Sequence, residues 1–198
     1  MSAQMPTVLL VPGLRGDMPD HWQTLLQAEL PKVACVPRLG HELSREAWVE
    51  ALDASIRAID GAIMLVAHSA GAIIVAHWAK THRRKIRGAL LATPPDLEAP
   101  LPDGYPSMQA LEENGWFPVP TAPLPFPSIV AASSNDPLAR IGRVLSLAVC
   151  WGSRFVDLGD VGHLNPASGY GPWPRAHDFI RELLVPVPLP ISKQRVDL

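Results

Sequence analysis

Hydrophobic residues form short, continuous runs along the chain, separated by longer segments with helical periodicity. The six strand-sized runs span 7–11, 33–36, 62–67, 89–92, 128–132 and 154–158. Several are continuous rather than alternating, which is typical of strands that are covered on both faces. The regular alternation of strands and helices predicts a mostly parallel central sheet of about six strands. Right-handed crossovers would then place helices on both faces.

Capping residues mark where several helices are expected to begin. Asp20 can cap a helix while Gln23 reaches back, which is a capping-box arrangement. From Ser44 onward, apolar residues recur at helical spacing. A further helix is predicted to open at Asp136-Pro137, because proline is tolerated in the first turn. Two more helices are expected, at 70–80 and 173–184.

A proline-rich segment at 94–127 breaks this alternation. It holds ten prolines, a density that forbids a long helix or a central strand. A short helical turn at 107–113 is the most it is expected to contain. The segment is either a functional loop or inert surface wrapping. The end of the chain, 185–198, is predicted to be an extended arm on a single domain that spans 1–198.

Composition and charge exclude several classes of protein. The chain has 198 residues, 47% of them hydrophobic, which is ample for a packed core. The formal net charge of -2 gives no general affinity for nucleic acid. The densest basic run, 82–85, follows a helical pattern. It is interpreted as a solvated helix end, where cations complement the helix dipole. No nucleic-acid partner is therefore expected.

The N-terminal pattern and the cysteines bear on location. No cationic segment precedes the short apolar run 8–11, and no window is long enough to cross a bilayer. Cys35 and Cys150 both have apolar neighbours in the sequence. They could form a disulfide, but two buried free thiols are the simpler interpretation. The sequence thus predicts a cytoplasmic protein that does not associate with a membrane.

The segment 63–74 carries the strongest chemical signal. An apolar strand is followed at once by Ser69 and then by a helix of small residues. A nucleophile elbow needs this order, because it presents the serine on a strained turn above the sheet edge. Small residues are expected two positions to either side, here Ala67 and Gly71. The alternative is that Ser69 only caps the helix; as a nucleophile it would need a base.

Among seven histidines, His163 is the candidate base. It follows the 154–158 strand in a loop with a flanking glycine, Gly162, so its ring can reach the edge that presents Ser69. His68 adjoins Ser69 but would point away from the attacking oxygen, toward packing or hydrogen bonding. The remaining histidines are interpreted as structural or solvent-facing; they are His21, His41, His77, His82 and His177.

Asp136 is the candidate acid. It follows the 128–132 strand and lies between the serine and the histidine in the chain, as a triad of this order requires. Its simpler role would be to cap a helix. Four other aspartates are weaker rivals, two in the proline-rich segment and two very close to His163 in sequence; they are Asp96, Asp103, Asp157 and Asp160.

An oxyanion hole would need two backbone N–H donors. Ala70, the residue after the candidate nucleophile, is expected to supply one. The loop after the first strand should supply the other. Because Pro12 has no N–H, Leu14 is the first choice there.

At these residues the chain resembles the small serine hydrolases related to YdeN and to retinoblastoma-binding protein nine. The similarity runs from Val11-Pro12-Gly13 through Asp20-His21-Trp22-Gln23 and Gly162-His163-Leu164-Asn165 to the closing segment 168–174. It implies a minimal α/β-hydrolase without a large cap domain, with a triad of Ser69, Asp136 and His163. Two departures are Ala67 in place of the commoner elbow glycine, and Pro12 where many such hydrolases carry histidine.

These features together predict a serine hydrolase that cleaves a small carboxyl ester through an acyl-enzyme. No metal or other cofactor is expected, because no cysteine–histidine cluster has ligand spacing. Thioester or peptide cleavage would use the same residues. An interaction protein that keeps the fold without activity is the alternative from another class. The proline-rich segment and the loop near Trp22 are candidate walls for the substrate site.

Overall fold

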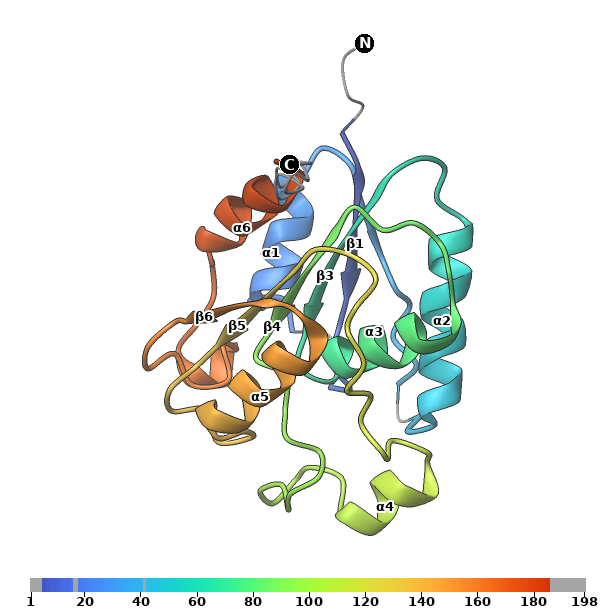
Figure 1. The fold of residues 1–198 in the computed structure, drawn as a ribbon. Helices are drawn as coiled ribbons and strands as arrows, with labels where there is room; N and C mark the ends of the chain where they lie inside the picture. The colour runs from blue at the N-terminus through green and yellow to red at the C-terminus, as the bar shows by residue number, and fades with distance from the viewer. Residues whose placement is uncertain (1–4, 16–17, 41, 186–198) are drawn as a thin grey trace, which may run out of the picture.

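A computed structural model describes residues 5–15, 18–40 and 42–185. Within them lies one sheet of six parallel strands in the order β2-β1-β3-β4-β5-β6 (Figure 1). The strands are β1 (Thr7–Val11), β2 (Val33–Cys35), β3 (Ile63–His68), β4 (Gly88–Ala92), β5 (Ser128–Ala132) and β6 (Arg154–Asp157). The predicted parallel sheet is therefore confirmed, with strand ends that move by one residue at most.

Helices cover both faces of this sheet (Figure 1). They are α1 (Trp22–Glu29), α2 (Arg45–Arg57), α3 (Ala70–Thr81), α5 (Ile141–Trp151) and α6 (Arg175–Leu184), whereas α4 (Met108–Glu113) lies beyond one end of the sheet. One core cluster joins the sheet to α2, α3 and α5, and a second joins it to α1 and α6. In β1, Leu9 belongs to the first cluster, whereas Val8 and Leu10 belong to the second. This two-sided burial explains why the strand runs are continuously apolar.

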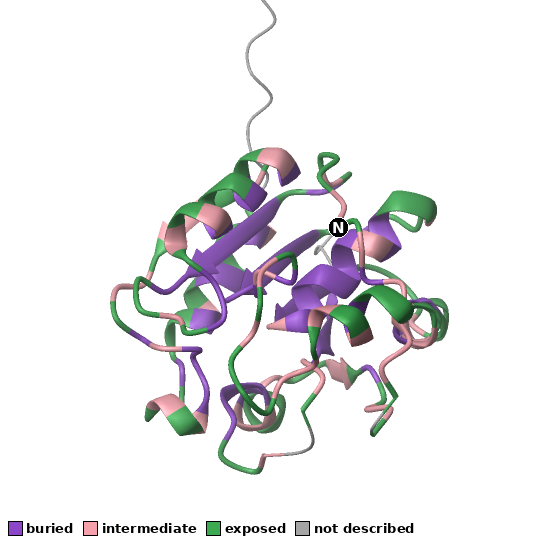
Figure 2. Ribbon diagram, turned by 90° about the horizontal axis from the view of Figure 1, so that it is seen from below, coloured by how far each residue is buried: buried purple, intermediate pink, exposed green. Residues whose placement is uncertain are grey.

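Burial follows the position of each strand in the sheet. Every residue of the four central strands β1, β3, β4 and β5 is buried, whereas the edge strands β2 and β6 are partly exposed. Figure 2 shows the same gradient, with buried sheet and buried inner helix faces beneath an exposed periphery. The proline-rich segment contributes the short helix α4 (Met108–Glu113), which confirms the helical turn predicted at 107–113; the side chain of Ser107 caps it.

Two predicted helix starts are wrong. Helix α1 is capped by His21 rather than Asp20, because the Nδ1 atom of His21 accepts the N–H of Gln23. The side chain of Gln23 does not reach back; it donates to the backbone oxygens of Val11 and Val66. Helix α5 begins at Ile141 instead of Asp136-Pro137. The chain forms a turn there instead, in which Oδ1 of Asp136 accepts the N–H of Leu138.

The cysteine prediction is half right. Cys35 and Cys150 form no disulfide with each other, as the simpler interpretation had it. Neither is buried, however: Cys35 is exposed and Cys150 is half-buried. Strand β2 lies at the sheet edge, so its apolar run is covered less than its sequence suggests.

Three further observations delimit the architecture. No large cap domain stands over the sheet in the part of the chain that the structure describes. Among those residues no helix is long and apolar enough to span a membrane. The predicted C-terminal arm falls, apart from Val185, outside the described residues.

Candidate active site

Ser69 stands on a sharp turn between β3 and α3. Its φ of 58° and ψ of -131° lie in a region that non-glycine residues rarely adopt. The backbone N–H of Ser69 donates to the carbonyl oxygen of Ala92 in the next strand, which fixes the turn. Its side chain makes no capping hydrogen bond to α3, so the simple helix-cap interpretation is wrong. The hydroxyl is thereby left free to face the carboxyl edge of the sheet.

Close packing around this turn depends on two glycines. A Cβ atom at Gly71 would lie 2.4 Å from the carbonyl oxygen of Val11, so only glycine lets α3 approach the end of β1. A Cβ atom at Gly13 would lie 3.1 Å from Cβ of Ser69, which places the loop after β1 directly against the serine. Ala67, the unusual elbow residue, is fully buried in the core, where a methyl group is accommodated.

His163 reaches the same edge from the loop after β6. Its Nε2 atom lies 2.9 Å from Oγ of Ser69 and accepts the hydroxyl proton, although 94 residues separate the two in sequence. The loop is fixed by three hydrogen bonds: Ser168 Oγ accepts the N–H of His163, Asn135 Oδ1 accepts the N–H of Gly162, and Ser133 Oγ accepts the N–H of Val161. The imidazole is therefore held by two neighbouring loops.

Asp136 completes this arrangement from the loop after β5. Its Oδ2 and Oδ1 atoms lie 2.9 and 3.1 Å from Nδ1 of His163, which donates to them. The two side chains are only 1% and 5% exposed, so water screens their interaction weakly. Oδ1 of Asp136 also accepts the N–H of Leu138, which orients the carboxylate. The structure thus brings together the three side chains that the sequence singled out.

The two predicted oxyanion donors lie next to Ser69. Ala70 is the first residue of α3, where backbone N–H groups have no partner within the helix. Leu14 follows Gly13 in the loop against the serine and lines the same cavity as Ala70. The N–H of Ser69 itself is not available, because Ala92 accepts it.

His68 lies beside His163, His21 lies beside His68, and both stay neutral near pH 7. His68 donates from Nε2 to the backbone oxygen of His163 at 2.9 Å, which confirms its predicted role beside the site. Complete burial, with the nearby histidines adding to it, lowers the pKa of His68 well below 6.5. Burial and the charge of Arg38 lower the pKa of His21 to about 4. The imidazoles of His21 and His68 therefore add hydrogen-bonding groups to the site but no charge.

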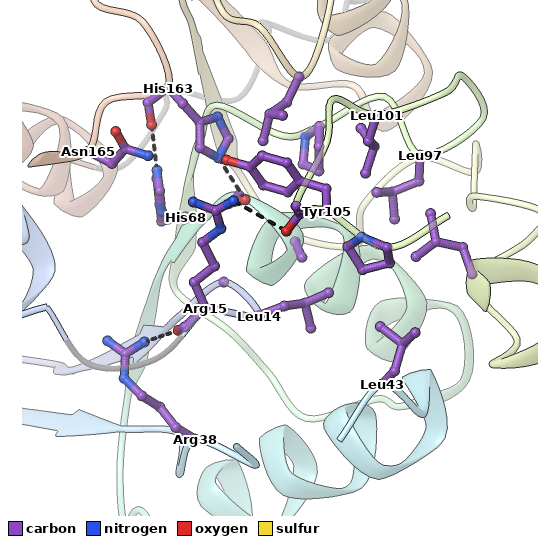
Figure 3. A pocket seen from close by; sticks show the side chains of 18 of the residues that line it. Leu14, Arg15, Arg38, Leu43, His68, Leu97, Leu101, Tyr105, His163 and Asn165 are labelled. Carbon is purple, nitrogen blue, oxygen red and sulfur yellow. Dashed lines mark hydrogen bonds between the residues drawn. The ribbon is translucent and has the colours of Figure 1, made fainter. Parts of the chain in front are cut away.

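A cavity of about 400 Å³ opens beside Ser69 (Figure 3). One wall comes from the proline-rich segment, through Leu97, Leu101 and Tyr105. Another comes from the start of α1, through His21. Both predicted wall segments therefore line the cavity. Among the described residues, no group of three or more histidine, cysteine or acidic side chains could hold a metal ion.

The sequence interpretation missed several lining residues, among them Arg15, Arg38, Tyr105 and Asn165. His21 was assigned a structural role, yet it both caps α1 and lines the cavity. The only available signal was position: Arg15 and Arg38 follow the first two strand runs, so they fall at the carboxyl edge of a parallel sheet.

Comparison with known proteins agrees with this geometry. The sequence model of the family described as serine hydrolase matches residues 8–182, which is most of the chain. The chain belongs to the serine hydrolase family. A comparison with curated proteins gave no match.

Solved structures place this serine hydrolase among the small YdeN-like α/β-hydrolases. A YdeN-like hydrolase from Pectobacterium atrosepticum is 27% identical, with a TM-score of 0.77 over 92% of this chain and 94% of that one. The ydeN gene product of B. subtilis is 18% identical, with a TM-score of 0.66 over 90% and 98%. An esterase from Thermogutta terrifontis has the same fold at 17% identity, with a TM-score of 0.60 over 91% of each chain.

Proposed function

We propose that this serine hydrolase cleaves small carboxyl esters by two-step acyl transfer at Ser69. The observation that carries the proposal is the hydrogen-bonded series from Ser69 Oγ to His163 Nε2 and from His163 Nδ1 to Asp136. A serine is a weak nucleophile until a base takes its proton, and an imidazole within 2.9 Å is placed to do so.

In the first step, Ser69 Oγ attacks the ester carbonyl while His163 Nε2 takes the hydroxyl proton. The bond between the carbonyl carbon and the alcohol oxygen then breaks, and His163 returns the proton to the departing alcohol. Asp136 holds the ring with its proton on Nδ1 and stabilises the imidazolium. The backbone N–H groups of Leu14 and Ala70 are the proposed donors to the oxyanion, each worth about 3 kcal/mol of barrier.

In the second step, His163 takes a proton from water, and the hydroxide attacks the acyl group on Ser69. The acid leaves and the serine recovers its proton. Small esters are favoured because the cavity has a volume of only about 400 Å³ and a wall rich in leucine and proline. The esterase among the fold relatives supports the same reaction class. The predicted cytoplasmic location and the single domain over 1–198 remain predictions from the sequence.

An active-site-directed probe and a short chromogenic ester test the proposal. A fluorophosphonate should label the wild-type protein and not the Ser69→Ala variant, and p-nitrophenyl butyrate should be hydrolysed by the wild type alone. The matched control is Ser146→Ala, which removes a hydroxyl that only bonds to its own helix α5 and should change neither readout. Equal labelling of wild type and Ser69→Ala would refute the nucleophile. Absence of both labelling and turnover in the wild type would favour an interaction protein.

A further inference from the structure

The two ends of the cavity beside Ser69 differ in chemistry (Figure 3). Leu43, Leu97 and Leu101 lie at one end, and all three also pack against the main core cluster or belong to it. Arg15 and Arg38 lie at the other end, on the side of His163. A ligand that fills the whole cavity would therefore need an apolar part and a part that tolerates or complements positive charge.

Arg15 is the cation best placed to meet a ligand. Its guanidinium carbon lies 3.9 Å from the ring centroid of Tyr105, and Nη2 donates weakly to the carbonyl oxygen of Gly104 at 3.5 Å. Both partners are neutral, and in the part of the chain that the structure describes no carboxylate pairs with Arg15. The ring of Tyr105 therefore holds the guanidinium in place. No acidic partner among the described residues neutralises its charge.

A second arginine lines the same end of the cavity. Nη1 of Arg38 donates to the backbone oxygen of Arg15 at 2.8 Å, which holds the loop that carries Arg15. Burial, and after it the charge of Arg38, lowers the pKa of His21 to about 4. Glu42 is the sole carboxylate among the described lining residues, and it already accepts the N–H of Ser44 at 2.7 Å.

The position of His163 decides which part of the substrate meets this charge. The group that leaves must receive its proton from Nε2 of His163, so it must lie on the imidazole side of Ser69. The ring centroid of His163 is 5.0 Å from that of His68, and both rings lie toward the arginine end (Figure 3). The acyl group then occupies the other end of the cavity, which the leucines line.

We infer that the substrate joins an apolar acyl group to an alcohol that carries an anionic group, and that Arg15 determines specificity for that anion. The inference rests on the proposed ester hydrolysis at Ser69. The ester bond breaks, the acyl group passes to Ser69 Oγ, and the anionic alcohol departs with a proton from His163. Charge-assisted hydrogen bonds to a planar guanidinium suit a carboxylate or a phosphate.

Two matched esters test the inference. The probes are 4-butanoyloxybenzoate and 4-butanoyloxybenzamide, which share the acyl group and the ring and differ in the charge of the leaving alcohol. In the wild type, kcat/KM should be about tenfold higher for the carboxylate, which corresponds to about 1.4 kcal/mol. Arg15→Gln should remove most of that preference, because kcat/KM should fall much more for the carboxylate ester than for the amide ester. Added salt should reduce the preference as well.

Two more variants separate charge from folding. Arg15→Lys keeps the charge and should keep part of the preference, while Arg57→Gln, an exposed arginine of α2 that does not line the cavity, should keep all of it. Equal kcat/KM for the two esters in the wild type, or an equal loss for both in Arg15→Gln, would overturn the inference and leave the hydrolase intact. Failure of both esters together with unlabelled Ser69 would remove the proposed function and this inference with it.

Discussion

The Nδ1 atom of His163 lies within 3.1 Å of both carboxylate oxygens of Asp136, and 27 residues of chain separate them. This contact fixes the proton on Nδ1 and leaves Nε2 to accept the hydroxyl proton of Ser69. The contact is also nearly dry, with the side chain of Asp136 only 1% exposed. The reactivity proposed for the site therefore depends on a carboxylate that never touches the substrate.

Replacing this carboxylate with its amide should leave the fold intact and remove most of the activity. In Asp136→Asn, the side chain can no longer hold the imidazole in the required tautomer, so kcat should fall by about 10³–10⁴-fold with little change in KM. Steady-state kinetics on p-nitrophenyl butyrate measures this. Asp160→Asn, a rival aspartate with an exposed side chain, is the control and should retain activity. A comparable loss in both variants would contradict the assignment.

The loop that carries His163 should be sensitive to a single methyl group. A Cβ atom at Gly162 would lie 2.5 Å from Oγ of Ser168, the atom that accepts the N–H of His163. Gly162→Ala should therefore displace the imidazole and lower kcat by more than about tenfold. Gly159 has a positive φ too but open space around it, so Gly159→Ala should cost only about 1 kcal/mol of backbone strain. Similar kcat values for the two variants would show that the loop tolerates the displacement.

Packing beneath the elbow should be equally intolerant. Gly71→Ala would drive a methyl group to 2.4 Å from the carbonyl oxygen of Val11, so α3 or the loop after β1 must shift. The free energy of unfolding should fall by about 1–3 kcal/mol. Gly142→Ala, in α5 with nothing within 4 Å, should raise it by about 0.5–1 kcal/mol. Urea denaturation measures both, and an unchanged midpoint for Gly71→Ala would contradict the close approach.

Stability should decline as the pH falls below the pKa of an unfolded histidine. Burial, with the charges of Arg45 and Lys80, lowers the pKa of His77 in the folded protein to about 4. The unfolded chain therefore binds a proton near pH 6.5 that the folded chain excludes until about pH 4, so stability is lost across that window.

The variant His77→Gln should reduce this pH dependence. Glutamine can still donate to the backbone oxygen of Trp116, which His77 Nε2 contacts at 3.2 Å, but it does not titrate. The fall in Tm between pH 7.5 and pH 5 should be smaller in the variant than in the wild type, while His21 and His68 maintain part of it. An identical fall in both proteins would show that His77 contributes nothing to it.

The errors in the sequence interpretation have specific physical causes. His21 replaces Asp20 as the cap of α1 because an imidazole nitrogen can accept the same backbone N–H, which the capping pattern does not reveal. Helix α5 begins late because Asp136 caps only a turn, through the N–H of Leu138, while its carboxylate also accepts a bond from His163, which the local pattern does not reveal. Cys35 is exposed because β2 lies at the sheet edge, and strand order is not encoded in an apolar run.

Local sequence was enough to determine the strands, the elbow at Ser69 and the chain order of the three polar residues, because burial and turn geometry leave patterns among neighbouring residues. Only the tertiary structure decided that Arg15 lies over Tyr105, that Arg38 bonds to Arg15, and that the leucines gather at the opposite end of the cavity. These contacts join loops that are distant in the chain. They arise when parallel strands bring their carboxyl ends to one edge, and no local periodicity records which side chains meet there.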